Sequence, residues 1–290
     1  MIHRPVLLNE VIEVLAPKAG EFFIDGTIDG GGHALAILEK LGPTGKLLGL
    51  DWDEKLILEA KKRLPKKGVK LINDNFKNLA EILKKNHLPK ADGLLLDLGF
   101  SLWHLEKSQR GFSFQIKEKD EPLIMTYSLS QKPLWQWLKE LKINQLAEII
   151  KKFGQERYAF RLAKMIKKNP PKTTSALVKI IKTALPKNWK HQRLHPATKT
   201  FLALRIFVNQ ELENLEIVLS KLEDIVKSGG RVAIISFNSL EDRLVKNAFK
   251  KLVKNQKGLL INKKPILPTL QEIKANPSCR SARLRAIKIL

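Results

Sequence analysis

The first hundred residues alternate short apolar runs with stretches of helical periodicity, and this alternation restricts the fold more than any other feature. The predicted strands are 21–27, 46–50, 69–72 and 91–98, and the predicted helices between them are 34–41, 54–64 and 79–85. Apolar runs without a polar side are typical of strands that are buried on both faces. When helices join such strands, a parallel sheet with right-handed crossovers forms, covered by helices on both sides. We therefore expect an open α/β sheet.

The alternation stops after Gly99 and resumes near residue 202. Between these points the periodicity predicts helices at 135–142, 145–152 and 157–168, the last of which ends at Asn169-Pro170-Pro171, and no convincing strand. Further along, the pattern predicts one long helix over 202–226 that ends at Ser228-Gly229-Gly230, a strand at 231–237, a helix at 240–252, and a closing antiparallel pair at 259–266 and 283–290. The simplest architecture is a sheet core of residues 1–103 and 206–290, interrupted by a helical insert of residues 104–205.

Positive charge is concentrated in this insert. The chain has 53 Lys and Arg against 29 Asp and Glu, and residues 104–205 hold 22 of the basic and 7 of the acidic ones. Such a surface attracts polyanions by neutralising phosphates and releasing their counterions. A lysine-rich composition would also produce basic helix faces, but it would raise both regions equally. An anionic membrane fits less well, because no amphipathic helix carries a Trp- or Phe-lined face.

Other compositional features limit the class of protein. Cys279 is the only cysteine, which excludes disulfide scaffolds and thiolate zinc clusters. The six histidines lack metal-ligand spacing, so we expect no metal. No apolar run reaches the length of a membrane span, and the first ten residues do not have the order of a signal peptide. A reducing cytoplasm is the expected location. The sequence leaves the oligomeric state open.

A glycine-rich turn follows the first predicted strand. It reads Asp25-Gly-Thr-Ile-Asp-Gly-Gly-Gly-His33 and opens the first helix, so a ligand can approach the backbone and the free N–H groups of the helix. Asp51 ends the next strand, where a carboxylate can accept both ribose hydroxyls of a nucleoside. A flexible turn and a capping aspartate would look similar. The turn is neither G-x-G-x-x-G nor a P-loop, so S-adenosylmethionine is favoured over a dinucleotide such as that of a dehydrogenase, and Asp25 could face its ammonium group.

A further carboxylate ends the fourth predicted strand, in Asp97-Leu-Gly-Phe-Ser101. Methyl transfer from a sulfonium mainly requires in-line placement of the acceptor, together with a group that takes any proton lost. Asp97 could accept a hydrogen bond from an exocyclic amine and make its lone pair more available. A helix-capping role is an equal alternative. Trp135 and Trp137 are interpreted as core residues of the insert rather than as base-stacking platforms.

Dispersed motifs, in one order along nearly the whole chain, resemble the family of ribosomal small-subunit RNA cytosine-N4 methyltransferases, called RsmH or MraW. The matching blocks are HRPVLLNE (3–10), DGTIDGGGH (25–33), DLGFS (97–101), RGFSF (110–114), FGQERYAFRLA (153–163), HPATKTFLALRI (195–206), ISFNSLEDRLVK (235–246) and NPSCRSARLR (276–285). The resemblance implies a class I S-adenosylmethionine-dependent methyltransferase fold, Rossmann-like and mostly parallel, with an inserted helical domain. It also implies N4-methylation of a cytidine in the decoding centre of 16S rRNA within the small ribosomal subunit.

The resemblance also implies roles for individual residues. The family's cofactor contacts fall on Gly31, Gly32, His33, Asp51, Phe76, Asp97 and His104. Candidate catalytic residues are Asp97, Ser101 and Asn238, and candidate RNA contacts are His195, Lys199, Arg205 and Arg243. Phe76 could instead be an ordinary aromatic residue of the core. The basic residues of the insert could instead lie on a solvated face that does not contact RNA.

Four departures from the family pattern bear on activity. Asp29 replaces a glycine, His104 replaces a glutamine, and Asn238 replaces the histidine of S-F-H-S-L-E-D-R. The family's P-L-D-M-R-M-D is here PLIMTYS (122–128), without two acids and an arginine. Asparagine cannot exchange a proton near neutral pH as histidine can. The alternative function is therefore a catalytically impaired methyltransferase fold that acts as an RNA-binding or ribosome-assembly factor.

Overall fold

A computed structural model describes residues 5–115, 120–186 and 195–290. His3, at the start of the first family motif, and His191 lie outside these residues. The chain divides into two compact units. Unit 1 comprises Met1–Gly99 and Leu212–Leu290, and unit 2 comprises Phe100–Glu211. Each unit is described by itself.

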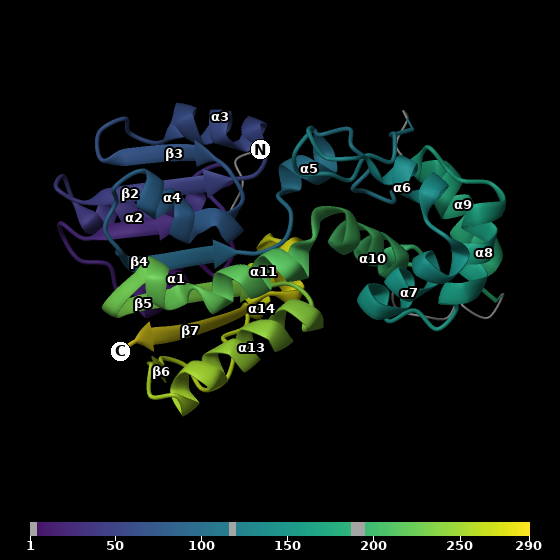
Figure 1. Ribbon diagram of the computed structural model, residues 1–290. Helices are drawn as coiled ribbons and strands as arrows, with labels where there is room; N and C mark the ends of the chain where they lie inside the picture. The colour runs from purple at the N-terminus through teal and green to yellow at the C-terminus, as the bar shows by residue number, and fades with distance from the viewer. Residues whose placement is uncertain (1–4, 116–119, 187–194) are drawn as a thin grey trace. The chain divides into compact units, whose positions relative to one another are not determined.

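Unit 1 is built on a seven-stranded sheet with the order β3-β2-β1-β4-β5-β7-β6 (Figure 1). The strands are β1 (Phe22–Asp25), β2 (Lys46–Asp51), β3 (Val69–Asn73), β4 (Ala91–Asp97), β5 (Val226–Ser236), β6 (Gly258–Leu260) and β7 (Arg283–Ile289). The pairs among β1 to β5 are parallel, whereas β7 is antiparallel to both β5 and β6. This confirms the predicted Rossmann-like sheet and its closing antiparallel pair.

Helices cover both faces of the sheet, because successive strand residues point to opposite sides and both sides are apolar. Leu94 and Leu96 of β4 face one core with α4 (Leu79–Lys85), α11 (Glu211–Ser220), α12 (Leu222–Ile225) and α13 (Ser239–Lys254). Leu95 faces the other core with α1 (Leu8–Leu15), α2 (Gly32–Leu41) and α3 (Glu54–Arg63). Shorter elements are η1 (Phe76–Asn78), α14 (Leu270–Ala275) and η3 (Pro277–Ser281).

Unit 2 is helical and has its own core. Its helices are α5 (Leu102–Glu106), α6 (Leu134–Glu140), α7 (Ile143–Gly154), α8 (Ala159–Lys168), α9 (Thr174–Ala184) and α10 (Thr198–Asn209). In its described part, the β structure is limited to one isolated bridge, between Pro122 and Thr173. Trp135 and Trp137 pack against the core of the unit, and α8 ends directly before Asn169, as predicted.

The predicted long helix over 202–226 is wrong. The helical backbone is interrupted at Gln210, whose φ of 51° is left-handed, and again at Lys221. At the first break the buried Asn209 side chain donates to the carbonyls of Met125 and Arg205 and accepts from the N–H of Tyr127. These tertiary bonds compete with helix continuation, whereas the apolar periodicity runs through the break. Ser228-Gly229-Gly230 lies inside β5 and does not end a helix.

Among the described residues, no helix combines the length and the apolar character needed to cross a membrane.

Gly93 marks the closest packing inside the sheet. A methyl group at this position would lie 2.1 Å from the ring of Phe23, which is itself almost fully buried. Gly93→Ala should therefore lower the free energy of unfolding by about 1–3 kcal/mol, the usual cost of overpacking a core. Urea denaturation measures this change. Gly30→Ala is the matched control, because open space surrounds Gly30; an equal loss in both variants would contradict this packing.

Candidate active site

The turn after β1 lies at the carboxyl edge of the sheet, where the strand order reverses between β1 and β4. Ligands of open α/β sheets bind in the crevice at such a position. Gly31, the N-cap of α2, has a φ of 78°, a conformation that favours glycine. Asp29 also has a positive φ, of 46°, which explains why a glycine is the usual residue there and why aspartate is tolerated. Gly32 is the first residue of α2.

Asp51 holds this turn from the end of β2. Its carboxylate accepts the backbone N–H of Asp29 at 3.0 Å and that of Asp53 at 2.9 Å. A carboxylate has about four acceptor positions, so Asp51 retains capacity for hydroxyl donors. Phe76, at the start of η1, packs beside the turn, since its Cβ lies 3.3 Å from the position of a methyl group on Gly26.

Thr27 connects the turn to β4. Its Oγ1 accepts the backbone N–H of Asp97 at 2.6 Å, and its own N–H donates to Oδ1 of Asp25 at 3.1 Å. Thr27 was not among the site residues predicted from the sequence. The signal for it is a threonine two residues after a strand-ending aspartate, the pattern of a local Asx turn.

Asp97 lies beside His33. Nε2 of His33 donates to the carbonyl of Val6 at 2.9 Å, and Nδ1 lies 3.7 Å from Oδ2 of Asp97. In the described part of the chain, the buried Oδ1 of Asp97 has no hydrogen-bond partner. At 3.7 Å this contact is longer than a hydrogen bond, and Oδ1 is left as an acceptor without a partner among the described residues.

Three carboxylates at this edge have raised pKa values, mainly because they are buried and further because of neighbouring negative charges. Burial raises the pKa of Asp25 to about 7. The hydrogen bonds from Thr27 oppose this shift, and the charge of Asp29 adds to it. Burial and the charges of Asp29 and Asp53 raise the pKa of Asp51 to about 8, against the hydrogen bonds that it accepts. Burial raises the pKa of Asp97 well above its ordinary value, and the negative charges of Asp25, Asp29 and Glu241 raise it further. A cation in this crevice would relieve the repulsion.

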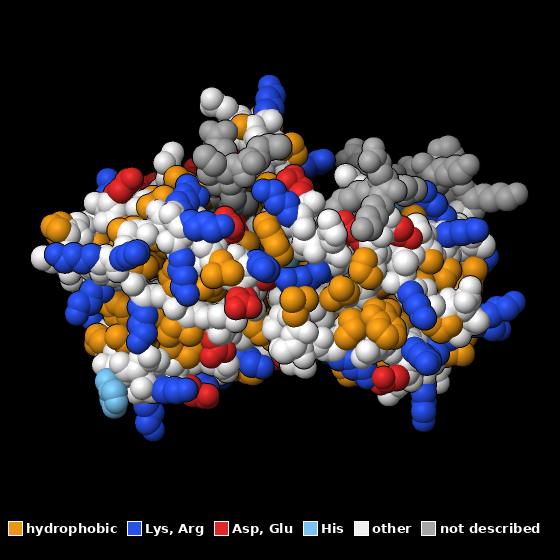
Figure 2. Space-filling model, turned by 90° about the horizontal axis from the view of Figure 1, so that it is seen from above, with side chains coloured by type: hydrophobic (Ala, Val, Ile, Leu, Met, Phe, Trp, Pro, Cys, Tyr) orange, Lys and Arg blue, Asp and Glu red, His pale blue; other side chains and the backbone are white. Residues whose placement is uncertain are grey.

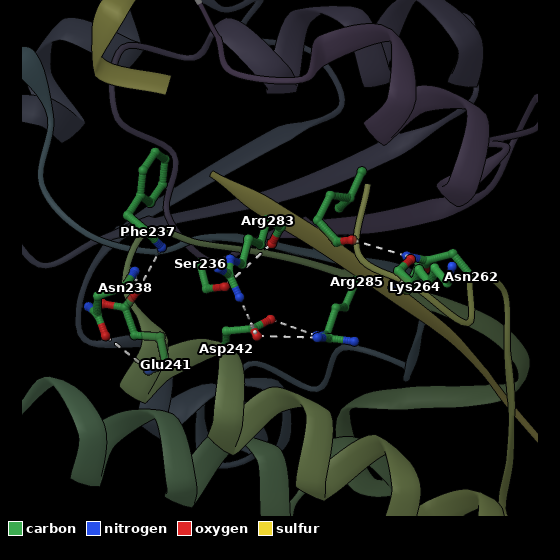
Figure 3. A network of polar contacts seen from close by, with 11 residues as sticks. Ser236, Phe237, Asn238, Glu241, Asp242, Asn262, Lys264, Arg283 and Arg285 are labelled. Atoms are coloured by element: carbon green, nitrogen blue, oxygen red, sulfur yellow. Dashed lines mark hydrogen bonds and ion pairs between the residues drawn. The ribbon is translucent and has the colours of Figure 1, made fainter. Parts of the chain in front are cut away.

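Asn238 lies at the next strand end and caps α13 (Figure 3). Its Oδ1 accepts the N–H groups of Leu240 and Glu241, both at 3.0 Å, and the buried Glu241 accepts the N–H of Phe237 at 2.8 Å in return. Nδ2 of Asn238 is buried and has no partner within the described residues. The N-S-L-E sequence is a capping box, so Asn238 has a clear structural role.

Asp242, next on α13, is held by two arginines of β7 (Figure 3). Its oxygens accept from Nε of Arg285 at 2.7 Å and from Nη1 of Arg283 at 3.2 Å. Although burial raises the pKa of Asp242, the hydrogen bonds and charges of Arg285 and Arg283 hold it below its ordinary value. This ion-pair network fixes α13 on the antiparallel end of the sheet. Arg243, the next residue, is exposed.

Ser101 and His104 belong to unit 2 and cap α5 together. Oγ of Ser101 accepts the N–H of Trp103 at 3.1 Å, and Nδ1 of His104 accepts the N–H of Ser101 at 3.2 Å. The buried His104 ring also packs against Phe112 and Tyr127. These contacts give both residues a local structural role, and their cofactor or catalytic roles stay predictions.

The three basic candidates of unit 2 differ in exposure. His195 is exposed and its ring stacks on Phe114, with centroids 4.7 Å apart. Lys199 lies near the carbonyl of Gln155, whereas Arg205 is only 7% exposed and forms a two-point ion pair with Glu211 at 2.8 and 2.9 Å. Direct RNA contact by Arg205 would require this buried pair to open. His195 is already exposed and needs no such change.

The described residues contain no group of three or more His, Cys, Asp or Glu side chains that could hold a metal ion.

The raised pKa of Asp25 predicts a pH dependence of stability. The unfolded chain releases this proton near pH 3.8, but the folded chain keeps it until about pH 7, so unfolding releases a proton between these values. The free energy of unfolding of the ligand-free protein should therefore fall as the pH rises through this window. Each unit of pKa difference corresponds to about 1.4 kcal/mol. Urea denaturation at several pH values should show a smaller fall for Asp25→Asn, and an identical fall in both proteins would contradict the assignment.

Sequence comparisons with known proteins point to one family. Residues 1–290 match the model of the MraW methylase family. The ribosomal RNA small subunit methyltransferase H of Syntrophus aciditrophicus (strain SB) is 41% identical over 305 residues, covering 98% of this chain and 96% of the relative. The protein of the same name from Thermotoga neapolitana is 43% identical over 295 residues, covering 99% and 96%. Among solved structures, Aeropyrum pernix fibrillarin in complex with natively bound S-adenosyl-L-methionine has a TM-score of 0.43 at 10% identity, covering 96% of this chain and 74% of that one. The resemblance inferred from the motifs is thus confirmed, and the chain belongs to the MraW methylase family.

Proposed function

We propose that this protein uses S-adenosylmethionine to methylate N4 of a cytidine in the decoding centre of 16S rRNA, within the small ribosomal subunit. Family membership and the names of the relatives support a methyltransferase acting on small-subunit rRNA. The observation that carries the finer proposal is the set of carboxylates with raised pKa values around the glycine turn, one of which has an acceptor oxygen without a partner among the described residues.

Charge favours this cofactor over a dinucleotide. The mutual repulsion of Asp25, Asp29 and Asp97 disfavours a pyrophosphate in the crevice and favours a ligand with a sulfonium and an ammonium group. This argues against the nicotinamide-dependent alternative. When bound, S-adenosylmethionine supplies an electrophilic methyl group.

Individual residues have distinct binding tasks. Asp51 would accept the ribose hydroxyls and Phe76 would pack against adenine. Gly31 and Gly32 would contact the ligand through backbone atoms at the start of α2, since Leu64 and Pro5 fill the space that their side chains would take. Asp25 and Asp97 would face the positive charges, with His33 holding Asp97 in place. His104, in unit 2, is assigned to the cofactor site by resemblance to the family.

Asp97 would act on the acceptor amine. Its free Oδ1 can accept an N4–H hydrogen bond, which makes the conjugated lone pair more available for in-line attack on the methyl carbon. S-adenosylmethionine would supply the methyl group to N4, and the methylated amine would then lose one proton. The carboxylate of Asp97 beside Nδ1 of His33 is positioned to take it. A cation in the crevice lowers the pKa of Asp97 and favours its ionised, accepting form.

Asn238 and Ser101 would orient groups rather than move protons. The amide of Asn238 does not titrate near neutral pH, and its unpartnered Nδ2 is a hydrogen-bond donor at the end of β5, next to β4. The basic helical unit would hold the RNA, with His195 and Lys199 as accessible contacts and Arg205 as a buried support. A cytoplasmic location follows from an rRNA substrate.

The departures at 122–128 motivate the non-catalytic alternative. Thr126 is fully buried and its Oγ1 has no partner within the described residues, where the family has an arginine. Arg110 nevertheless donates to the carbonyls of Thr126 and Tyr127 and so keeps this segment in place. An impaired enzyme would bind the RNA without turnover.

Asp51→Ala should raise the dissociation constant of S-adenosylmethionine by at least about tenfold, equivalent to about 1.4 kcal/mol, because the ribose loses its acceptor. Isothermal titration calorimetry measures this constant. Asp224→Ala, which removes an exposed carboxylate elsewhere in unit 1, is the control. An unchanged constant in Asp51→Ala would remove this residue from the cofactor site.

The unaltered protein should form N4-methylcytidine when it is incubated with unmodified small ribosomal subunits and S-adenosylmethionine. Asp97→Asn should slow single-turnover methyl transfer by on the order of 100-fold at saturating cofactor, the usual scale of a lost acid–base group. Nucleoside mass spectrometry identifies the product, and Asp224→Asn controls for the lost charge. RNA binding by the unaltered chain without any N4-methylcytidine would support the non-catalytic alternative.

A further inference from the structure

The surface of α13 carries a stripe of basic side chains. Arg243, Lys246, Lys250 and Lys254 are all exposed, and their spacing of three or four residues places them on one side of the helix. The opposite side holds the buried Val245 and Phe249. The stripe extends about 16 Å along the axis, at 1.5 Å per residue. We call these four residues the α13 stripe.

No acidic side chain that the structure describes pairs with this stripe. In the described part of the chain, none of its four side chains makes an ion pair or a hydrogen bond, and the only acids of α13, Glu241 and Asp242, are buried. Nearby lysines behave differently: Lys221 pairs with Glu81 at 3.2 Å and Lys257 pairs with Glu223 at 3.0 Å. The stripe is therefore an uncompensated line of positive charge.

Basic character alone would not mark a binding surface here. Figure 2 shows Lys and Arg side chains spread widely over the face in view, with Asp and Glu also present among them. The α13 stripe differs because like charges recur every four residues, at Lys246, Lys250 and Lys254, which destabilises an isolated helix. Folding does not require that arrangement, whereas a linear polyanion does complement it.

The position of α13 connects the stripe to the candidate active site. The helix begins at the Asn238 cap directly after β5, whose Ile235 pairs with Asp97 of β4. Arg243 lies about one turn into the helix, so the stripe starts beside the carboxyl edge of the sheet and leads away from it. Covering the same face of the sheet, α11 instead exposes Glu213 and Glu216, which would repel a phosphate chain.

We propose that the α13 stripe is a second RNA-binding surface, which binds the phosphate backbone of the substrate RNA on unit 1 independently of the basic helical unit. This inference rests on the proposed rRNA substrate and adds where that RNA is held. The contacts are with phosphates, so they contribute affinity and orientation and little sequence discrimination.

The test compares two triple variants that remove the same charge. The stripe variant removes three of the four stripe charges and carries Lys246→Gln, Lys250→Gln and Lys254→Gln. The control variant removes three exposed lysines from the region of α3 and the start of β3, through Lys61→Gln, Lys66→Gln and Lys67→Gln. Binding to protein-free 16S rRNA is measured by filter retention at salt concentrations between about 50 and 200 mM. The stripe variant should bind at least about tenfold more weakly, and its slope of log affinity against log salt should be smaller by about two, because each phosphate contact contributes about 0.7–0.9. The control should match the unaltered protein.

Three further measurements separate the possible outcomes. The variant with Lys246→Arg, Lys250→Arg and Lys254→Arg should retain affinity and slope, because it keeps the charge. Methylation of small subunits by the glutamine variant should show a raised KM with an unchanged kcat. Equal affinity and equal salt slope in both glutamine variants would overturn the proposal that the α13 stripe binds RNA. The proposed function would still be supported if the unaltered protein transferred methyl groups. Stripe-dependent binding to phosphatidylserine vesicles, with unchanged RNA binding, would also overturn it.

Discussion

The backbone turn after β1 is hydrogen-bonded to both neighbouring strands, and the candidate site depends on this connection. The N–H of Gly26 donates to the carbonyl of Leu95 on β4, and the N–H of Ile28 donates to that of Leu50 on β2. Thr27, between them, accepts the N–H of Asp97. Three parallel strands are thereby held at a common edge, so their terminal carboxylates meet in a volume that little water reaches. The electrostatics of the site follow from this register.

Carboxylates brought together in this way reduce the stability of the ligand-free protein. Their raised pKa values show that the folded state disfavours their charged forms, and perturbed groups of this kind gather at functional sites. A cationic nucleoside would offset that repulsion and gain specificity from the same groups. The contrast with Asp242 is informative: it is also buried, but two arginines lower its pKa, so its role is to fix α13.

Much of the fold could be predicted from local pattern, and the exceptions have long-range causes. The strands of the first hundred residues were predictable because both-face burial leaves a clear apolar run. The break at Gln210 was not, because Asn209 makes its bonds to residues about eighty positions away. Asp25, Asp51 and Asp97 could be predicted from their positions at strand ends. The capping role of His104 and the buried pairing of Arg205 required tertiary structure.

The residues that depart from the family pattern preserve the local geometry of the backbone better than they preserve the capacity for proton transfer. Asp29 adopts the left-handed backbone that glycine usually provides, and Asn238 caps α13 through a two-point contact with its first turn. Arg110 supports the 122–128 segment through backbone carbonyls, which are independent of the side chains lost there. What a histidine at 238 would add is titration near neutral pH. Without it, the proposed chemistry assigns the departing amine proton to Asp97, which lies beside His33.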